Sequence, residues 1–230
     1  MLTKAIRWYL KGLFPLSIYI PLLIFIAFSQ YYLLTTSIIP NRVFVFSSIT
    51  QTLLIPIVIL TVASHFFRNK QITVFELTLI GSWRNLAIAK IITFTVGIAP
   101  FIALEVVILW LSNYLSLLFP VLVTIAVYES LSLLASLSQS QMTAFMIDLV
   151  FVLLFPIGAE SLLGSYAKFH YTAGVTGSII LYFIAPLISY GYWPQVVNVN
   201  PLVGLSLALI IALVLIALYP YLFKRLEFKP

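Results

Sequence analysis

The sequence contains no cysteine and few charged residues of either sign. Its 230 residues include six acidic and twelve basic side chains. The absence of cysteine excludes disulfides, thiol nucleophiles and Cys-ligated metal sites. With 63% hydrophobic and 8% charged residues, the chain also lacks the polar surface that a soluble domain needs. The composition therefore predicts a protein embedded in a membrane.

Long apolar runs take the place of that polar surface. Several exceed ~18 residues, which is enough for a helix to cross a hydrocarbon core of ~30 Å. The predicted fold class is an all-α polytopic membrane protein, with residues 1–230 forming a single transmembrane domain. Six transmembrane helices are predicted over residues 14–35, 43–67, 91–111, 115–137, 143–163 and 202–223.

The first thirteen residues have the pattern of an amphipathic helix. Apolar and basic side chains fall on different faces, and Trp8 adds an interfacial aromatic ring. We expect residues 1–13 to form an interfacial helix. The alternative is a frayed basic tail that only obeys the positive-inside rule.

Residues 164–201 are the hardest part of the chain to assign. Their one apolar run, Ile179–Tyr190, is short and is broken by Pro186, which favours a re-entrant region on the outer side over a seventh span. With six spans and both termini cytoplasmic, only Arg42 and Lys168 fall outside. The other basic residues all fall on the cytoplasmic side: Lys4, Arg7, Lys11, Arg68, Lys70, Arg84, Lys90, Lys224, Arg225 and Lys229. This asymmetry follows the positive-inside rule and indicates a multi-pass protein of the cell (plasma) membrane.

The formal net charge of +6 does not indicate a nucleic-acid partner. The basic residues stand at the ends of apolar runs, where they act as topology signals and contact lipid headgroups. Membrane lipid is therefore an expected partner, and nucleic acid is not.

Residues 68–90 form a polar interruption between the second and third spans. Thr73 and Glu76 have the Thr-x-x-Glu spacing of a capping box, and Gly81 suits a helix end. The spacing predicts a two-turn helix of about Val74–Ile80 on the cytoplasmic side. A helix this short needs packing to hold it, and it suits insertion into a groove of a partner. The alternative is a short helix that lies on the bilayer surface.

Several short motifs in this order resemble the ABC-2 class of membrane subunits of ATP-binding cassette exporters. A basic lead precedes Thr73-x-x-Glu76-Leu77, Leu79 and Gly81-Ser82-x-Arg84, and Lys90 then opens an apolar helix. Before the last span, Asn200-Pro201-Leu202 is similar to an Asn-Pro-Leu-Thr element of that family, with Val203 in place of the threonine. The chain departs from the family in lacking a proline near Ser82 and a large outer domain.

This resemblance implies a fold and a set of partners. Residues 1–13 would be the family's elbow helix, residues 68–90 its cytoplasmic coupling segment, and short re-entrant outer helices would precede the sixth span. Two copies of a cytoplasmic ABC ATPase subunit and a second permease subunit, identical or related, are the implied partners. ATP and Mg would bind to the ATPase, because this chain has no phosphate-binding Gly-x-x-x-x-Gly-Lys motif, and no cofactor is expected in the chain itself. The residues expected to couple to the ATPase are Thr73, Phe75, Glu76, Leu77, Leu79, Ile80 and Arg84.

A second group of candidate residues is polar and lies within the predicted spans. Charged groups at this depth are costly and usually face a cavity or a partner. They would form structural hydrogen bonds, or they would line a pathway and bind substrate or protons. The group consists of Ser47, Thr50, Gln51, Glu105, Glu129 and Asp148.

Three functions remain open on the sequence. The first is the permease subunit of an ATP-driven exporter, whose walls would suit an amphipathic substrate. The second is a structural accessory subunit of a larger membrane assembly, for example a respiratory one. The third is an intramembrane enzyme, which requires the buried acids to converge on one cavity. No Ser-His-Asp or His-Glu-x-x-His arrangement supports that third function, and no enzymatic activity is expected of this chain.

Overall fold

The computed structural model describes residues 2–13, 16–36, 41–68, 70–138, 140–159 and 201–225. Within these ranges the chain is helical and has no strand, as the sequence predicts. Five helices are long and apolar enough to cross a membrane: Arg42–Ser64, Trp83–Leu111, Leu115–Ala135, Gln141–Ala159 and Leu202–Arg225. They identify the described part of the chain as an all-α, multi-pass membrane protein.

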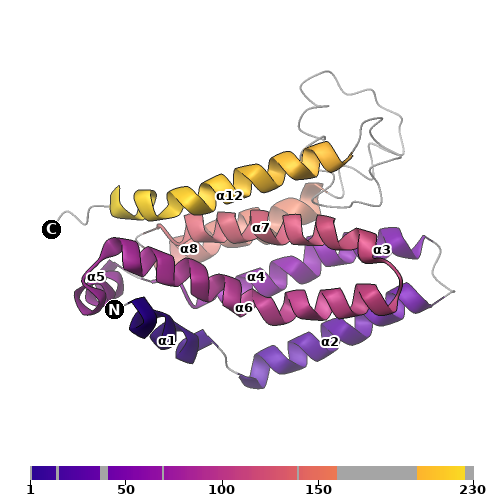
Figure 1. Ribbon diagram of the computed structural model, residues 1–230, viewed down its shortest axis with the longest axis horizontal. Helices are drawn as coiled ribbons and strands as arrows, with labels where there is room; N and C mark the ends of the chain where they lie inside the picture. Colours follow the sequence, from indigo (N-terminus) through magenta and orange to yellow (C-terminus); the bar gives the residue numbers. More distant parts are fainter. Residues whose placement is uncertain are drawn as a thin grey trace.

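The long helices lie roughly parallel in one bundle, with two short helices near one end (Figure 1). The predicted first span is a helix, but its apolar stretch Tyr19–Thr35 is shorter than the five above. In chain order the elements are α1 (Leu2–Leu13), α2 (Leu16–Thr35), α3 (Arg42–Ile49), η1 (Thr50–Leu54), α4 (Ile55–Ser64), α5 (Lys70–Ile80), α6 (Trp83–Leu111), η2 (Leu115–Leu117), α7 (Leu118–Ala135), α8 (Gln141–Asp148), η3 (Leu149–Leu154) and α12 (Pro201–Arg225).

The helix α6 begins before the predicted third span. It starts at Trp83, so the end of the predicted polar segment, residues 83–90, is already helical. Ser82 caps this helix, because its side chain accepts a hydrogen bond from the backbone N–H of Asn85 at 3.4 Å. At 1.5 Å per residue the 29 residues of α6 span about 44 Å, which exceeds the hydrocarbon core. The predicted re-entrant region, residues 164–201, lies outside the described residues apart from Pro201.

The core is built where α6 and α7 meet their neighbours. The helix α12 packs on both of them, α4 also packs on both, and η3 lies against α4 and α7. Large side chains close to the centre, among them Phe94, Phe101 and Tyr219, have no more than about 1% of their surface exposed. This close packing fixes the positions of the polar side chains that the same helices carry.

The amino-terminal helix α1 packs along α6. Its faces differ as the sequence pattern predicts, since Ala5 and Tyr9 are buried whereas Arg7 and Trp8 are exposed. An amphipathic helix is therefore confirmed, and its apolar face is covered at least partly by protein.

Two of the long helices contain a π-helical segment just before a proline. The segment η1 ends at Leu54, two residues before Pro56, and η3 ends at Leu154, two residues before Pro156. A proline has no N–H and its ring collides with the carbonyl four residues earlier. The wider π turn removes that collision, and both helices continue through their prolines.

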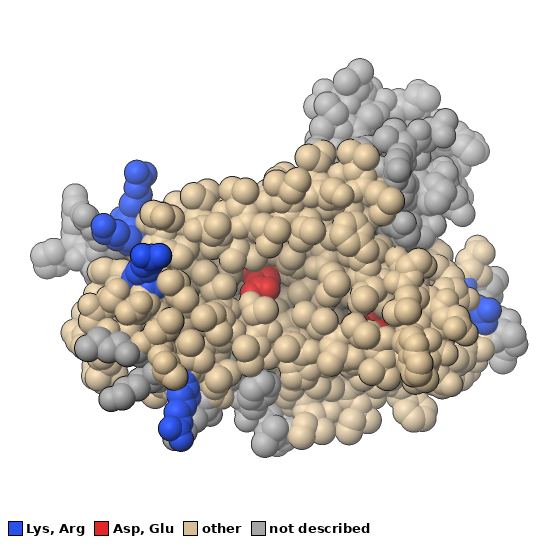
Figure 2. Space-filling model, in the orientation of Figure 1, with Lys and Arg blue, Asp and Glu red and all other residues tan. Residues whose placement is uncertain are grey.

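Basic side chains gather at one end of the bundle (Figure 2). That end holds α5 and both ends of the described chain (Figure 1). The exposed basic residues of this set are Arg7, Arg84, Lys224 and Arg225, and Arg68 is partly exposed. The charge asymmetry predicted from the sequence is thus present in three dimensions among the described residues.

Candidate functional site

The polar interruption contains a helix, α5, that is longer than predicted. It runs from Lys70 to Ile80, which is three turns in place of two. The predicted capping box is wrong, because Thr73 lies one turn inside the helix and cannot be its N-cap. Gly81 does end the helix: it has a φ of 70°, and its N–H donates to the carbonyl of Leu77 at 2.7 Å. Of all residues, glycine adopts this left-handed conformation after the last helical turn with the least strain.

The helix α5 has two different faces. Phe75 and Leu79 expose 59% and 62% of their surface, and Ile72 exposes 41%. Arg84, just beyond the helix, is also exposed. On the opposite face Thr73, Glu76 and Ile80 are buried and Leu77 is partly buried. Of the residues predicted to couple to a partner, only Phe75, Leu79 and Arg84 are freely available on the surface of this chain.

The buried face of α5 carries a charged group at its centre. Glu76 accepts a hydrogen bond from the Tyr9 hydroxyl at 2.7 Å through Oε2. The Lys90 Nζ lies 3.9 Å from the same oxygen, and the Arg68 Nε lies 3.7 Å from Oε1. The Lys90 Nζ also lies 5.2 Å from the centre of the Phe223 ring. We call Tyr9, Arg68, Glu76, Lys90 and Phe223 the Glu76 cluster.

The Glu76 cluster joins four helices and a connecting segment. Its members come from α1, the segment after α4, α5, α6 and α12. Burial raises the pKa of Tyr9, and the nearby Glu76 carboxylate raises it further, so this phenol stays protonated and keeps its hydrogen to donate. A displacement of α5 would therefore act directly on α1 and α6 through the contacts of Glu76 with Tyr9 and Lys90.

His65 caps the end of α4, close to the Glu76 cluster. It directly follows Ser64, the last residue of α4. Partial burial lowers the pKa of His65, and the positive charge of Arg68 lowers it further. The imidazole is therefore neutral at neutral pH.

The three acids of the spans each have one neutral hydrogen-bond donor on another helix. Glu105 accepts from the Gln30 side chain at 2.6 Å, Glu129 accepts from the Thr95 hydroxyl at 2.7 Å, and Asp148 accepts from the Ser132 hydroxyl at 2.6 Å. All three are nearly fully buried. Among the described residues, no basic side chain lies within ion-pair distance of any of them. These bonds agree with the structural role; a role with substrate or protons stays a prediction.

The polar cluster of the second span is also buried within the chain. Ser47 donates to the carbonyl of Phe44, Thr50 accepts from the Gln30 amide at 3.0 Å, and Gln51 donates to Thr124 at 3.0 Å. Ser47, Thr50 and Gln51 expose no more than 3% of their surface. The bonds of Thr50 and Gln51 join α2, the α3–η1 helix and α7 inside the bundle, which agrees with a structural role; a role in a pathway stays a prediction.

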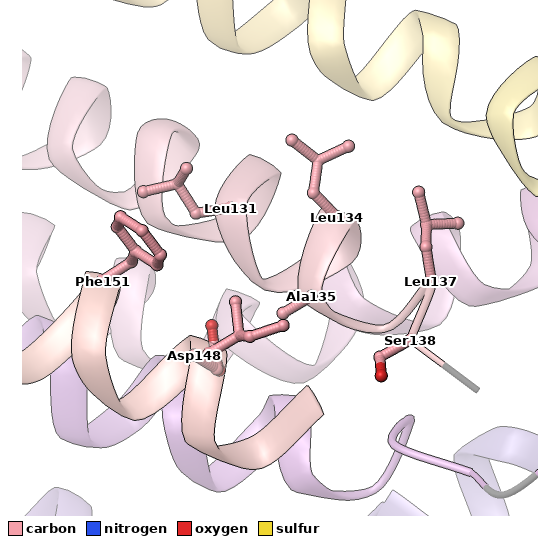
Figure 3. Close-up of a pocket in the computed structure, with 8 residues that line it drawn as sticks. Leu131, Leu134, Ala135, Leu137, Ser138, Asp148 and Phe151 are labelled. Atoms are coloured by element: carbon pink, nitrogen blue, oxygen red, sulfur yellow. The ribbon is translucent and has the colours of Figure 1, made fainter. Parts of the chain in front are cut away.

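One cavity reaches a buried acid. It has a volume of about 510 Å³ and lies between α7 and the α8–η3 helix. Figure 3 shows Asp148 and Phe151 on one side and the α7 residues Leu131 and Leu134 on the other. The remaining wall residues are Ala135, Leu137, Ser138 and Ile147. Of the three acids of the spans, Asp148 alone lines this cavity.

A second, smaller cavity of about 380 Å³ lies where the end of α4 meets the start of α8. Ser64, Phe67, Ser140, Gln141, Met142 and Phe145 line it. None of these described residues is charged, and none of them is predicted to be functional.

Sequence reasoning missed two features that the structure brings out. The first is the Glu76 cluster, whose members are too far apart in the chain to be related by spacing. The second is a short internal repeat, Leu53-Leu54-Ile55-Pro56-Ile57 and Leu153-Leu154-Phe155-Pro156-Ile157. Each copy marks a change from π to α geometry, so a search for repeated proline contexts would have found it.

No group of three or more His, Cys, Asp or Glu side chains that could hold a metal ion occurs within the described ranges. Comparisons with protein-family models, with curated proteins and with solved structures gave no match to this chain.

Proposed function

We propose that this chain is the membrane subunit of an ATP-driven exporter of the ABC-2 type. The observation that carries the proposal is the helix α5, which stands between two long membrane helices at the basic end of the bundle. Ile72, Phe75 and Leu79 present an apolar face there that no other described element covers. A short helix anchored on one side and apolar on the other suits insertion into a groove of a partner protein.

In this proposal the chain crosses the membrane six times, with α2 as the first span. The basic end is cytoplasmic, as the positive-inside rule favours, so α1, α5 and both termini lie on that side. The helix α1 acts as the elbow helix and α5 as the coupling helix. Residues 164–201 form the outer re-entrant region.

Two such subunits, identical or related, and two copies of a cytoplasmic ATPase would form the transporter in the cell membrane. ATP and Mg bind to the ATPase subunits. Their closure moves α5, and the Glu76 cluster passes this movement to α1, α6 and α12 as near-rigid bodies. Phe75, Leu79 and Arg84 contact the ATPase, whereas Thr73, Glu76 and Ile80 hold the helix on its own subunit and Leu77 packs beside them.

The test is co-purification from native membranes in a mild detergent. A protein with a nucleotide-binding site should be recovered with the wild-type chain and identified by mass spectrometry. The double variant Phe75→Ala with Leu79→Ala should lose most of that partner, because an apolar helix face of this kind supplies the central contacts of such an interface. The matched control is Phe28→Ala, since Phe28 is equally large and 79% exposed but lies on α2.

Full recovery of the ATPase with the Phe75→Ala, Leu79→Ala variant would show that α5 is not part of the interface. Recovery of redox proteins in place of any ATPase would instead support the accessory-subunit function. An unchanged ATPase rate of the purified complex after that double substitution would likewise contradict coupling through α5.

A further inference from the structure

The cavity at Asp148 combines an apolar wall with one incompletely satisfied carboxyl group. Leu131, Leu134, Leu137, Ile147 and Phe151 supply apolar surface, and Asp148 is the one charged residue among the eight that line the cavity. Its Oδ1 accepts from the Ser132 hydroxyl at 2.6 Å, but its Oδ2 is buried and has no hydrogen-bond partner among the described residues. A buried carboxylate oxygen without a donor is costly, and a donor on a group that arrives from outside the chain would remove that cost.

The shape of the cavity follows from the two helices that form it. Leu131, Leu134, Ala135 and Ser138 recur at the spacing of a single helix face, and the small Ala135 leaves room opposite Asp148. The π segment η3 begins at Leu149, directly after the acid, and widens the helix at this point. The volume of about 510 Å³ lies in the range of small-molecule sites.

The position of the cavity selects ligands that come from the bilayer. Only 22% of an 18-residue apolar stretch of the helix Gln141–Ala159 is buried within the chain, so most of this helix is free to contact lipid. Asp148 lies seven residues after Gln141, or about 10 Å along the helix from its end. That depth suits a headgroup just below the interface, with an alkyl or aromatic body in the apolar part of the cavity.

From this geometry we propose that the cavity binds an amphiphilic amine, with its ammonium group on Asp148 and its apolar body against Leu131, Leu134 and Phe151. The ammonium gives Oδ2 the donor it lacks, and its charge matches the carboxylate in a region with little water. A neutral or anionic amphiphile of the same length gains only the apolar contacts or is repelled. This site needs no ATPase, so it is independent of the function proposed above.

The test uses the purified chain in nanodiscs of phosphatidylcholine and tritiated dodecylamine as the probe. After subtraction of the uptake by empty nanodiscs, the wild-type chain should bind dodecylamine saturably. Unlabelled dodecylamine should displace the probe, whereas dodecanol and dodecyl sulfate should not. The substitution Asp148→Asn should weaken binding about tenfold or more, because it removes the ionic part of the contact.

Two further variants separate binding from folding. Leu134→Trp keeps the acid but fills the cavity, and it should also abolish saturable binding. The matched control Glu129→Gln removes another buried acid, one that does not line the cavity, and should leave the affinity within about twofold. Gel filtration and thermal unfolding identify any variant that does not fold, and Leu134→Trp decides the outcome if Asp148→Asn is such a variant.

Three results would overturn the proposal: no saturable binding above that of empty nanodiscs, equal displacement by dodecanol, or full affinity in folded Asp148→Asn. The competition between dodecylamine and dodecanol needs only the wild-type chain, so the test remains decisive even if every variant misfolds.

Discussion

Glu76 and the acids within the spans are buried to a similar extent but are satisfied in opposite ways. Glu76 has two basic side chains within 4 Å and a phenol that donates to it. Glu105, Glu129 and Asp148 each have a neutral donor and no basic partner in the described part of the chain. The carboxylate at the end of the bundle is thus stabilised as an ion. Each acid deeper in the bundle joins two helices through one hydrogen bond from a neutral donor.

This difference predicts which substitutions each of the two regions will tolerate. In the Glu76 cluster a change of charge leaves another buried charge without its partner. Within the spans the loss of an acid leaves no such cation behind. The following predictions test that contrast.

The largest effect is expected from Glu76→Gln. The side chain keeps its size and can still accept from Tyr9, but Lys90, with 1% of its side chain exposed, loses its counter-ion. Removing one member of a buried pair costs about 3–5 kcal/mol in the free energy of unfolding. Unfolding in mixed micelles with increasing SDS measures this loss.

A double variant shows whether the loss comes from the orphaned lysine. Combining Glu76→Gln with Lys90→Met removes both charges and keeps an apolar side chain against Phe223. Replacing a whole buried pair by neutral groups is often close to neutral in free energy. The double variant should therefore recover most of the stability, and an equal or greater loss would show that the pair is not what holds α5.

A smaller effect is expected from Tyr9→Phe. This change removes the 2.7 Å hydrogen bond to Glu76 but leaves the ring in its place between Trp8 and Phe66. A hydrogen bond to a charged group contributes about 1.5–3 kcal/mol, and the same SDS titration should show a loss of that size. The control is Tyr32→Phe, which changes a tyrosine that is 56% exposed and should be neutral.

The two regions also differ in how far the sequence could predict them. The all-α class and the approximate limits of most membrane helices follow from runs of apolar residues that are local in the chain. The end of α5 was predictable too, because Gly81 marks it locally. The buried face of α5 was not, since Glu76 meets Tyr9 from 67 residues away and meets Lys90 on the next helix, α6. Such contacts depend on tertiary packing, which the spacing of residues along the chain does not predict.

The substitution Glu105→Gln, in contrast to Glu76→Gln, is expected to change the free energy of unfolding only little. The new amide oxygen can accept from Gln30 in place of the carboxylate, and the new N–H₂ group can donate to the Gln30 Oε1, which has no partner among the described residues. A gain and a loss of single neutral hydrogen bonds leave a difference of about 1 kcal/mol or less. A loss as large as that of Glu76→Gln, by the same SDS titration, would mean that Glu105 is bound as an ion after all.

The smallest effect concerns His65 and appears only as a dependence on pH. Its pKa is lowered in the folded chain, mainly by burial and then by Arg68, whereas in the unfolded chain it has the ordinary value of about 6.5. As the pH falls below that value, the unfolded chain takes up a proton more readily than the folded chain, so the stability should decrease. His65→Gln cannot take up this proton and should show a shallower decrease between about pH 7.5 and pH 5. The difference between the melting temperatures of variant and wild type across that range isolates His65 from every other titrating group. A constant difference would mean that the His65 imidazole is free to ionise in the folded state and lies outside the field of the Arg68 charge.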